Sequence, residues 1–201
     1  MSKSFRLVLL LLVLIFLGGC ARKIPHMLVH DYANQGARLI AVLPVQNMES
    51  DDGTASLLRV KLIEELHFKG YPEIPLKWID ERLAALTAND GKRDLTPQSL
   101  GRILNVDAVL YTTLKEGRAS VTLIYSPVAV DAEFELKSAS TGESLWRVHY
   151  RAVYRNYGFS RRSLELKSSR VYEPAIQEVL NRALETLPDG PDAIGTFSTG
   201  S

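Results

Sequence analysis

The sequence predicts an α/β domain in which a mixed, mostly antiparallel β-sheet is packed with helices. Residues 38–105 begin with a short apolar run and continue with segments whose apolar side chains recur at helical spacing. Residues 107–154 change to the period of two that is typical of strands, and residues 171–187 return to helical spacing. Because helices separate the first strand from the others, we expect it to join the sheet in parallel through a right-handed crossover. The later strands should form an antiparallel meander.

The first half of the domain is predicted to contain one strand, three helices and a short extended segment at residues 71–75. The run RLIAVLPV at residues 38–45 is apolar and short enough for a buried strand, which Pro44 ends. Residues 54–69 are expected to form an amphipathic helix. Shorter helices are expected at residues 76–86 and 96–105, the second with a threonine as N-cap and a proline at the first helical position. The apolar stripe of the first helix comprises Leu57, Leu58, Leu62, Ile63 and Leu66.

The second half is predicted to form four strands and a final helix. The alternating segments are residues 107–115, 119–125, 128–138 and 144–154. Turns are expected at Glu116–Gly117, at Ser126–Pro127 and at residues 140–142. Residues 156–167 are basic and show no period, so they are expected to be irregular, and the helix is expected at residues 171–187. Trp146, early in the last strand, is expected to lie in the core.

The N-terminus has the pattern of an export signal. Lys3 and Arg6 precede an uninterrupted apolar run at residues 7–17. This run is too short for a bilayer-spanning helix, which needs about 20 residues, and it has the length of a signal-peptide core. The sequence LGGC at residues 17–20 resembles the lipobox of bacterial lipoproteins.

The lipobox resemblance implies cleavage between Gly19 and Cys20, followed by attachment of a diacylglyceryl group and an N-linked acyl chain to Cys20. No other cofactor is expected. Cys20 is the only cysteine, so no internal disulfide can form. The alternatives are an ordinary secretory signal with an incidental cysteine and a short anchor that is never cut. Ala21 stands where an aspartate retains lipoproteins in the inner membrane of enteric-type bacteria. The resemblance therefore implies the outer membrane, with the domain facing the periplasm.

The chain is thus expected to divide into four segments. These are a signal peptide at residues 1–19, the lipidated cysteine and a tether at residues 20–37, the α/β domain at residues 38–187, and a disordered tail at residues 188–201. The sequence has 24 Lys and Arg against 23 Asp and Glu, and two of the cations fall in the signal peptide. The mature chain is therefore near neutral, which argues against nucleic acid as a partner.

The sequence contains no strong enzymatic or metal-binding motif. The G-x-S-x-G, P-loop and H-E-x-x-H patterns are absent, and the four histidines are scattered, so no metal site is expected. The acidic loop with Glu49, Asp51 and Asp52 lacks the ligand spacing of a calcium loop, and helix capping explains it better. Asp131 and Glu133 share one face of a strand. They leave a periplasmic hydrolase acting on cell-wall material as the alternative function.

A basic stretch with interleaved aromatic residues follows the last strand. A patch of one charge sign beside aromatic side chains is typical of a contact surface, although a solvated loop has the same composition. The expected partners are the membrane through the lipid, other envelope proteins, or further copies of the chain. The candidate partner-binding residues are Arg155, Tyr157, Phe159, Arg161 and Arg162.

Four segments together resemble a known family. They are AVLPVQN after the first strand, GYPEIPL after the first long helix, NVDAVLYTTL at the following strand and TGESLW at the last hairpin. In this order they are similar, over residues 24–187, to a family of small Gram-negative lipoproteins of unknown function. The resemblance implies a single domain like the N-terminal domain of TolB and the periplasmic domain of the curli secretion lipoprotein CsgG. It also implies a non-catalytic scaffold or accessory role in an envelope assembly for secretion, transport or a surface structure.

Overall fold

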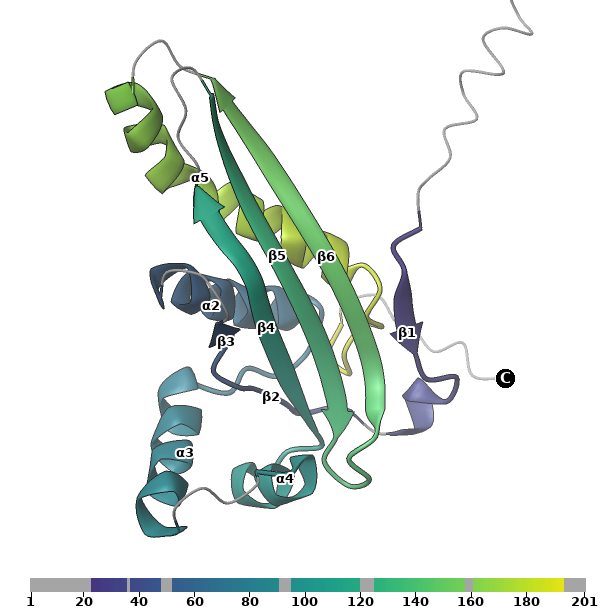
Figure 1. Cartoon of the computed structure of the whole chain (residues 1–201). Coiled ribbons are helices and arrows are strands. Elements are labelled where there is room, and N and C mark those ends of the chain that lie inside the picture. The colour runs from purple at the N-terminus through teal and green to yellow at the C-terminus, as the bar shows by residue number, and fades with distance from the viewer. Residues whose placement is uncertain are drawn as a thin grey trace, which may run out of the picture.

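The computed structural model shows a six-stranded sheet with helices on both faces (Figure 1). It describes residues 23–35, 37–47, 52–90, 95–119, 125–157 and 161–193. The strands are β1 (His26–Leu28), β2 (Ile40–Val42), β3 (Gln46–Asn47), β4 (Ala108–Ala119), β5 (Tyr125–Ser138) and β6 (Ser144–Tyr157). The helices are the 3-10 helix η1 (Tyr32–Gln35) and the α-helices α2 (Asp52–Phe68), α3 (Leu76–Asp90), α4 (Pro97–Leu104) and α5 (Arg161–Leu184). The predicted fold class is confirmed.

The sheet has the order β1-β6-β5-β4-β2, and β3 also pairs with β4. The strands β4, β5 and β6 are antiparallel neighbours, as predicted for the meander. The strand β2 pairs in parallel with β4, with Ile40 opposite Ala108, and the helices α2 to α4 make the crossover between them. The parallel pairing expected for the first strand is therefore confirmed, although the strand is shorter than residues 38–45.

The described residues of the meander form three long strands, and most of the fourth predicted strand, residues 120–124 of 119–125, lies outside the described part of the chain. Glu116–Gly117 and Ser126–Pro127, expected as turns, lie inside β4 and β5. An irregularity between Leu114 and Glu116 shifts the register of β4 on β5, and a glycine beside such a bulge is common in strands. The predicted turn at residues 140–142 is confirmed, and Gly142 adopts a positive φ of 80° there.

The main core lies between the sheet and the helices α2 and α5, which cover the back of the sheet in Figure 1. The predicted stripe of the first helix faces this core: Leu58, Leu62, Ile63 and Leu66 are buried and Leu57 is half-buried against it. Trp146 is fully buried, as expected, and its Nε1–H donates to Thr186 Oγ1 at 2.9 Å.

A second, smaller core covers one end of the opposite face. Ile79 of α3 and Leu100 and Leu104 of α4 pack there against Ala41 and Val109 of the sheet. The start of α4 is as predicted from sequence, because Thr96 Oγ1 accepts a hydrogen bond from the Ser99 N–H and a proline follows it. Since these helices cover only that end, the rest of this face is open.

The N-terminal segment is not a free tether, contrary to the expectation for residues 20–37. Residues His26–Leu28 form β1, which pairs antiparallel with β6 and places Met27 opposite Arg147. Tyr32 is buried, and its hydroxyl lies 2.9 Å from the hydroxyl of Tyr71. The segment was misjudged because β1 is short and has no alternating pattern of its own. The segment forms a strand because it pairs with the edge of β6.

The first part of the expected disordered tail is also packed. Tyr71 donates its hydroxyl hydrogen bond to the Pro188 carbonyl at 2.9 Å, and the Gly190 N–H donates to the Lys69 carbonyl at 2.7 Å. Gly70, with φ of 86°, allows this close approach, because a Cβ there would lie 2.2 Å from the Ala193 nitrogen. The tail therefore belongs to the domain up to residue 193.

The last helix begins ten residues earlier than predicted. The structure has α5 from Arg161, where residues 156–167 were expected to be irregular. The sequence RRSLELKSSR at residues 161–170 lacks a continuous apolar stripe, so its helical spacing could not be recognised. Among the described residues, no helix combines the length and the apolar character needed to cross a membrane.

An ion pair between the nearly buried Arg59 and the half-exposed Asp80 joins α2 to α3, and two neighbouring substitutions should differ in their effect. Arg59 donates to the Val42 carbonyl at 2.9 Å and forms a two-point contact with Asp80 at 2.8 and 2.9 Å. Asp80→Ala leaves the Arg59 charge without its carboxylate, so we expect the free energy of unfolding to fall by about 1–3 kcal/mol. Equilibrium denaturation in urea measures the change. The neighbouring control Glu81→Ala removes an exposed carboxylate and should change it by less than about 0.5 kcal/mol. Equal effects of the two variants would contradict the prediction.

Candidate docking surface

The open face is the uncovered side of β4, β5 and β6. Side chains alternate between the two faces of a strand, so the outward row of β5 contains Asp131, Glu133 and Glu135. The pairing of β5 with β6 sets Arg151, His149 and Arg147, respectively, directly opposite these carboxylates. Besides these two rows, the charged residues of the open face include Lys115 and Glu116 on β4, Lys137 on β5 and Arg155 on β6.

Ion pairs run continuously across the open face. Glu133 lies 2.6 Å from Lys115 Nζ and 4.0 Å from Arg147 Nε. Arg147 also pairs with Glu135. The two carboxylates are thus bridged by one guanidinium, which holds both in a defined position.

A second group of ion pairs surrounds Asp131. His149 Nε2 lies 2.5 Å from Asp131 Oδ1, and Arg151 Nε lies 3.8 Å from Asp131 Oδ2. Arg151 also reaches Glu116, at 2.9 Å. Basic side chains from β4 and β6 therefore hold the acidic side chains of β5 in position.

These pairs partly cover the carboxylates and shift the pKa of Glu133. The side chains of Asp131 and Glu135 are only 16% and 17% exposed, although they lie on the outer face, because the longer cationic side chains extend over them. The hydrogen bond from Lys115 lowers the pKa of Glu133 below its ordinary value of 4.5 and outweighs desolvation, which raises it. A general acid in a hydrolase needs a raised pKa. The sequence placed Asp131 and Glu133 on one face correctly, but the lowered pKa of Glu133 disfavours this residue as the general acid of the hydrolase alternative.

The pKa of Glu133 provides a test of this arrangement. Lys115→Gln removes the charged hydrogen-bond donor, so the pKa of Glu133 should rise toward 4.5. The wild-type chain should also lose stability as the pH falls below 4.5 and through the lower folded pKa, because the ionised form is the one the fold favours. Carboxyl-carbon NMR titration measures the pKa directly. Lys77→Gln on α3 is the control, and an unchanged Glu133 titration in the Lys115 variant would contradict the assignment.

A model of a known protein family matches most of the chain. The model described as "Putative lipoprotein GNA1162-like" matches residues 30–192. The chain belongs to the GNA1162-like lipoprotein family. This confirms the resemblance to small lipoproteins, while the likeness to TolB and CsgG stays a prediction. No curated protein matches the chain.

Several solved structures are similar to this GNA1162-like chain. The crystal structure of lipoprotein GNA1162 from Neisseria meningitidis matches with a TM-score of 0.51 and 23% identity, covering 71% of this chain and 98% of that one. The PelC dodecamer from Paraburkholderia phytofirmans matches with a TM-score of 0.43 and 18% identity over 80% and 92% of the two chains. The LpoB C-terminal domain from Escherichia coli matches with a TM-score of 0.41 and 17% identity over 58% and 82%.

The structure places the residues predicted to bind partners in two different elements. Arg155 is exposed on β6, in the outward row of the open face, and Tyr157 is the last residue of that strand. Arg161 and Arg162 form the first turn of α5, and Phe159 lies outside the described residues. The predicted single basic loop is therefore split between a strand end and a helix start.

Other predicted site residues lie outside the described part of the chain. These include Gly19 and Cys20 of the lipobox and Glu49 and Asp51 of the acidic loop. Within the described residues, no three His, Cys, Asp or Glu side chains come close enough together to hold a metal ion.

The sequence prediction missed the basic residues of β6 that complete the open face. Arg147, His149 and Arg151 recur at every second residue, as the carboxylates of β5 do. This alternation indicates, from the sequence alone, that the basic side chains of β6 share one face and that the carboxylates of β5 share one face. The register between the strands, which decides the ion pairs, required the structure.

Proposed function

We propose that this GNA1162-like lipoprotein is held at the outer membrane, facing the periplasm, by acyl chains on Cys20 and that it docks an envelope protein through its open face. The family and the lipobox pattern support the anchor. The role is that of a scaffold or accessory subunit rather than an enzyme.

The anchor is strong enough for a permanent role at the membrane. Each buried methylene adds about 0.8 kcal/mol of membrane affinity, and one myristoyl chain alone gives only marginal binding. A diacylglyceryl group with an N-linked chain supplies two or three acyl chains. Ala21, in place of the inner-membrane retention aspartate, supports transfer to the outer membrane.

The preformed ion-pair network of the open face carries the docking proposal. Its side chains are already held by partners within the sheet, so docking costs less side-chain entropy than it would on a face of free lysines. Positive and negative groups alternate across it, from Lys115 to Glu133 to Arg147. A mosaic of both signs complements a folded protein surface better than a polyanion of one sign. Val153, exposed between Arg151 and Arg155, offers an apolar contact on the same face.

Site-specific photocrosslinking in cells tests the docking proposal. A photoreactive amino acid at Val153 should give a discrete crosslinked product, whereas the same amino acid at Lys77 on α3 should not. Identification of the product by mass spectrometry also distinguishes an envelope protein from a second copy of the chain.

Arg155→Glu should reduce the yield of the Val153 product several-fold, because reversal of an exposed charge replaces attraction by repulsion. The yield of the wild-type product should fall with salt, which screens the attraction. Lys77→Glu is the matched control and should leave the yield unchanged. Products of equal yield from Val153 and Lys77, insensitive to Arg155→Glu, would contradict the docking role of this face.

A further inference from the structure

The folded domain begins very close to the lipidation site. Ile24 is half-buried and packs against the main core, and its carbonyl lies 2.8 Å from His26 Nδ1. The strand β1 then fixes residues 26–28 on the edge of β6. The chain is therefore held in place from Ile24 onward.

This start leaves little chain between the lipid and the domain. Cys20 and Lys23 are three residues apart, and a fully extended chain of that length spans at most about 11 Å. The 18-residue tether expected from the sequence would have spanned roughly 60 Å. A lipid on Cys20 therefore brings the first residues of the domain to the bilayer surface and limits which side of the domain can face it.

The side around β1 has the chemistry of a membrane contact. A groove of about 910 Å³ is lined there by residues 23–26, by His149 to Arg151 of β6 and by the end of α5. Its cations Lys23 and Arg182 face a single carboxylate of the lining, Glu185, whereas Arg151 is already paired with Glu116 and Asp131. Two histidines, His26 and His149, also line the groove. Arg182 lies 3.3 Å from Glu178 and 3.5 Å from Glu185, and half of its side chain remains exposed.

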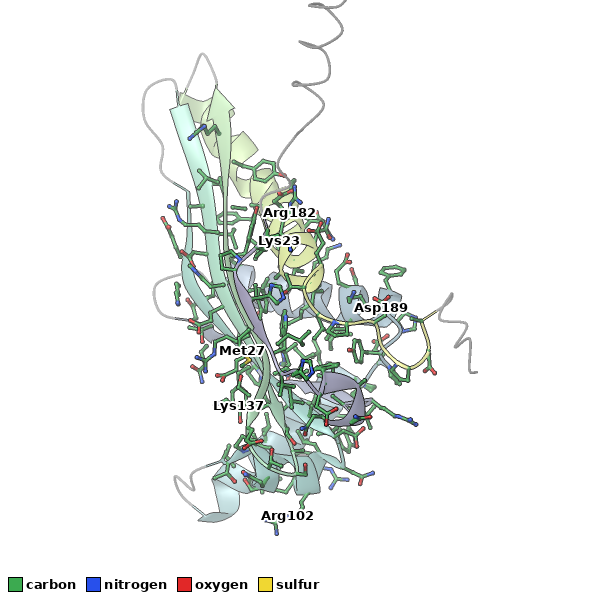
Figure 2. The ribbon with its side chains drawn as sticks, turned by 90° about the vertical axis from the view of Figure 1, so that its right-hand side faces the viewer. Lys23, Met27, Arg102, Lys137, Arg182 and Asp189 are labelled. Atoms are coloured by element: carbon green, nitrogen blue, oxygen red, sulfur yellow. The ribbon has the colours of Figure 1, made fainter. Side chains whose placement is uncertain are left out.

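Exposed apolar side chains follow the groove residues along β1. Met27, on the edge strand β1, is 40% exposed, and the neighbouring Leu28 is exposed to a similar extent. Figure 2 views the molecule from this side and shows Lys23 and Arg182 close together, with Met27 farther down and Arg102 at the distant end. Cations next to exposed apolar residues are typical of surfaces that rest on anionic lipids.

We propose that the β1 side, formed by residues 23–28 and the adjoining groove, lies on the bilayer that holds Cys20. Lys23 and Arg182 contact lipid phosphates, and Met27 and Leu28 lie at the boundary with the acyl chains. This inference rests on the proposed lipidation. It has a direct consequence for docking: β1 is one edge of the sheet, so the sheet stands edge-on to the membrane and its open face points sideways, accessible to a partner (Figure 1).

The test uses the full-length lipidated protein with one introduced label. Cys20 is the only cysteine and is consumed by lipidation, so Met27→Cys and Arg102→Cys each provide a single free thiol for an environment-sensitive fluorophore. Each protein is reconstituted into vesicles of phosphatidylethanolamine and phosphatidylglycerol that contain headgroup spin-labelled lipid. We expect several-fold stronger quenching at position 27 than at position 102. The double substitution of Lys23 and Arg182 by serine should weaken the quenching at position 27.

The outcomes separate this inference from the proposed function. Vesicle flotation reports the anchor: a protein that fails to float refutes the lipidation and with it this inference. A protein that floats but is quenched equally at positions 27 and 102 overturns the orientation alone. Protection of position 27 from aqueous iodide without quenching by the spin-labelled lipid also overturns it, because a protein, such as a second copy, would then cover this side.

Discussion

Replacement of Cys20 by alanine should abolish lipidation and cleavage together and leave an unlipidated precursor that is lost from the outer-membrane fraction. The thioether to the diacylglyceryl group can form only at the cysteine sulfur, and the lipoprotein-specific peptidase is expected to require the modified residue. Because each buried methylene contributes about 0.8 kcal/mol, loss of two or three acyl chains removes the anchor to the outer membrane, and the precursor keeps only the apolar run at residues 7–17. This is the largest effect that we expect from a single substitution.

Metabolic labelling with a clickable fatty acid measures the effect of the Cys20 variant, and electrophoresis separates the precursor from the mature chain. Gly18→Ala is the matched control, because it keeps a small residue in the lipobox and should be labelled and cleaved like the wild type. Equal labelling of the Cys20 variant and the wild type would refute the lipobox assignment. A labelled protein that stays in the inner-membrane fraction would refute only the sorting inferred from Ala21.

Local chemistry explains which elements could be predicted from the sequence. The boundaries of α4 depend on Thr96, Pro97 and Asn105, whose capping roles are decided within one or two turns of chain. The long strands depend on distant partners, so Gly117 and Pro127 were mistaken for turns, although Gly117 pairs with Val130 of β5 and Pro127 pairs with Arg155 of β6. Glycine and proline usually indicate a turn in an isolated segment, but pairing with neighbouring strands can hold them in an extended backbone.

The same reasoning applies to the candidate surfaces. The alternation in β5 correctly placed Asp131 and Glu133 on one face, because the period of a strand is a local property. Their partners on β4 and β6 depend on the register between strands, which one sequence does not reveal. The side proposed to face the membrane could not be predicted from the sequence either, because residues 26–28 form a strand only by pairing with β6.

Truncation of Leu62 to alanine should lower the free energy of unfolding by about 2–5 kcal/mol, the range for large-to-small changes in a core that cannot collapse onto the cavity. Leu62 lies in the middle of α2, is 0% exposed and belongs to the main core between the helices and the sheet. A domain of this kind is stable by only about 5–15 kcal/mol, so this loss is a large fraction of the total.

Val60 provides a matched control for this core position. It lies two residues away on the same helix, is 44% exposed, and keeps the same backbone and helix environment. Val60→Ala also replaces a β-branched residue by a better helix former, so its effect should be under about 0.5 kcal/mol in either direction. Urea denaturation of a chain from residue 21 onward, followed by circular dichroism, compares the two variants with the wild type. If Leu62→Ala were as mild as Val60→Ala, the helix would present a different face to the sheet, and the packing of α2 against α5 would have to be revised.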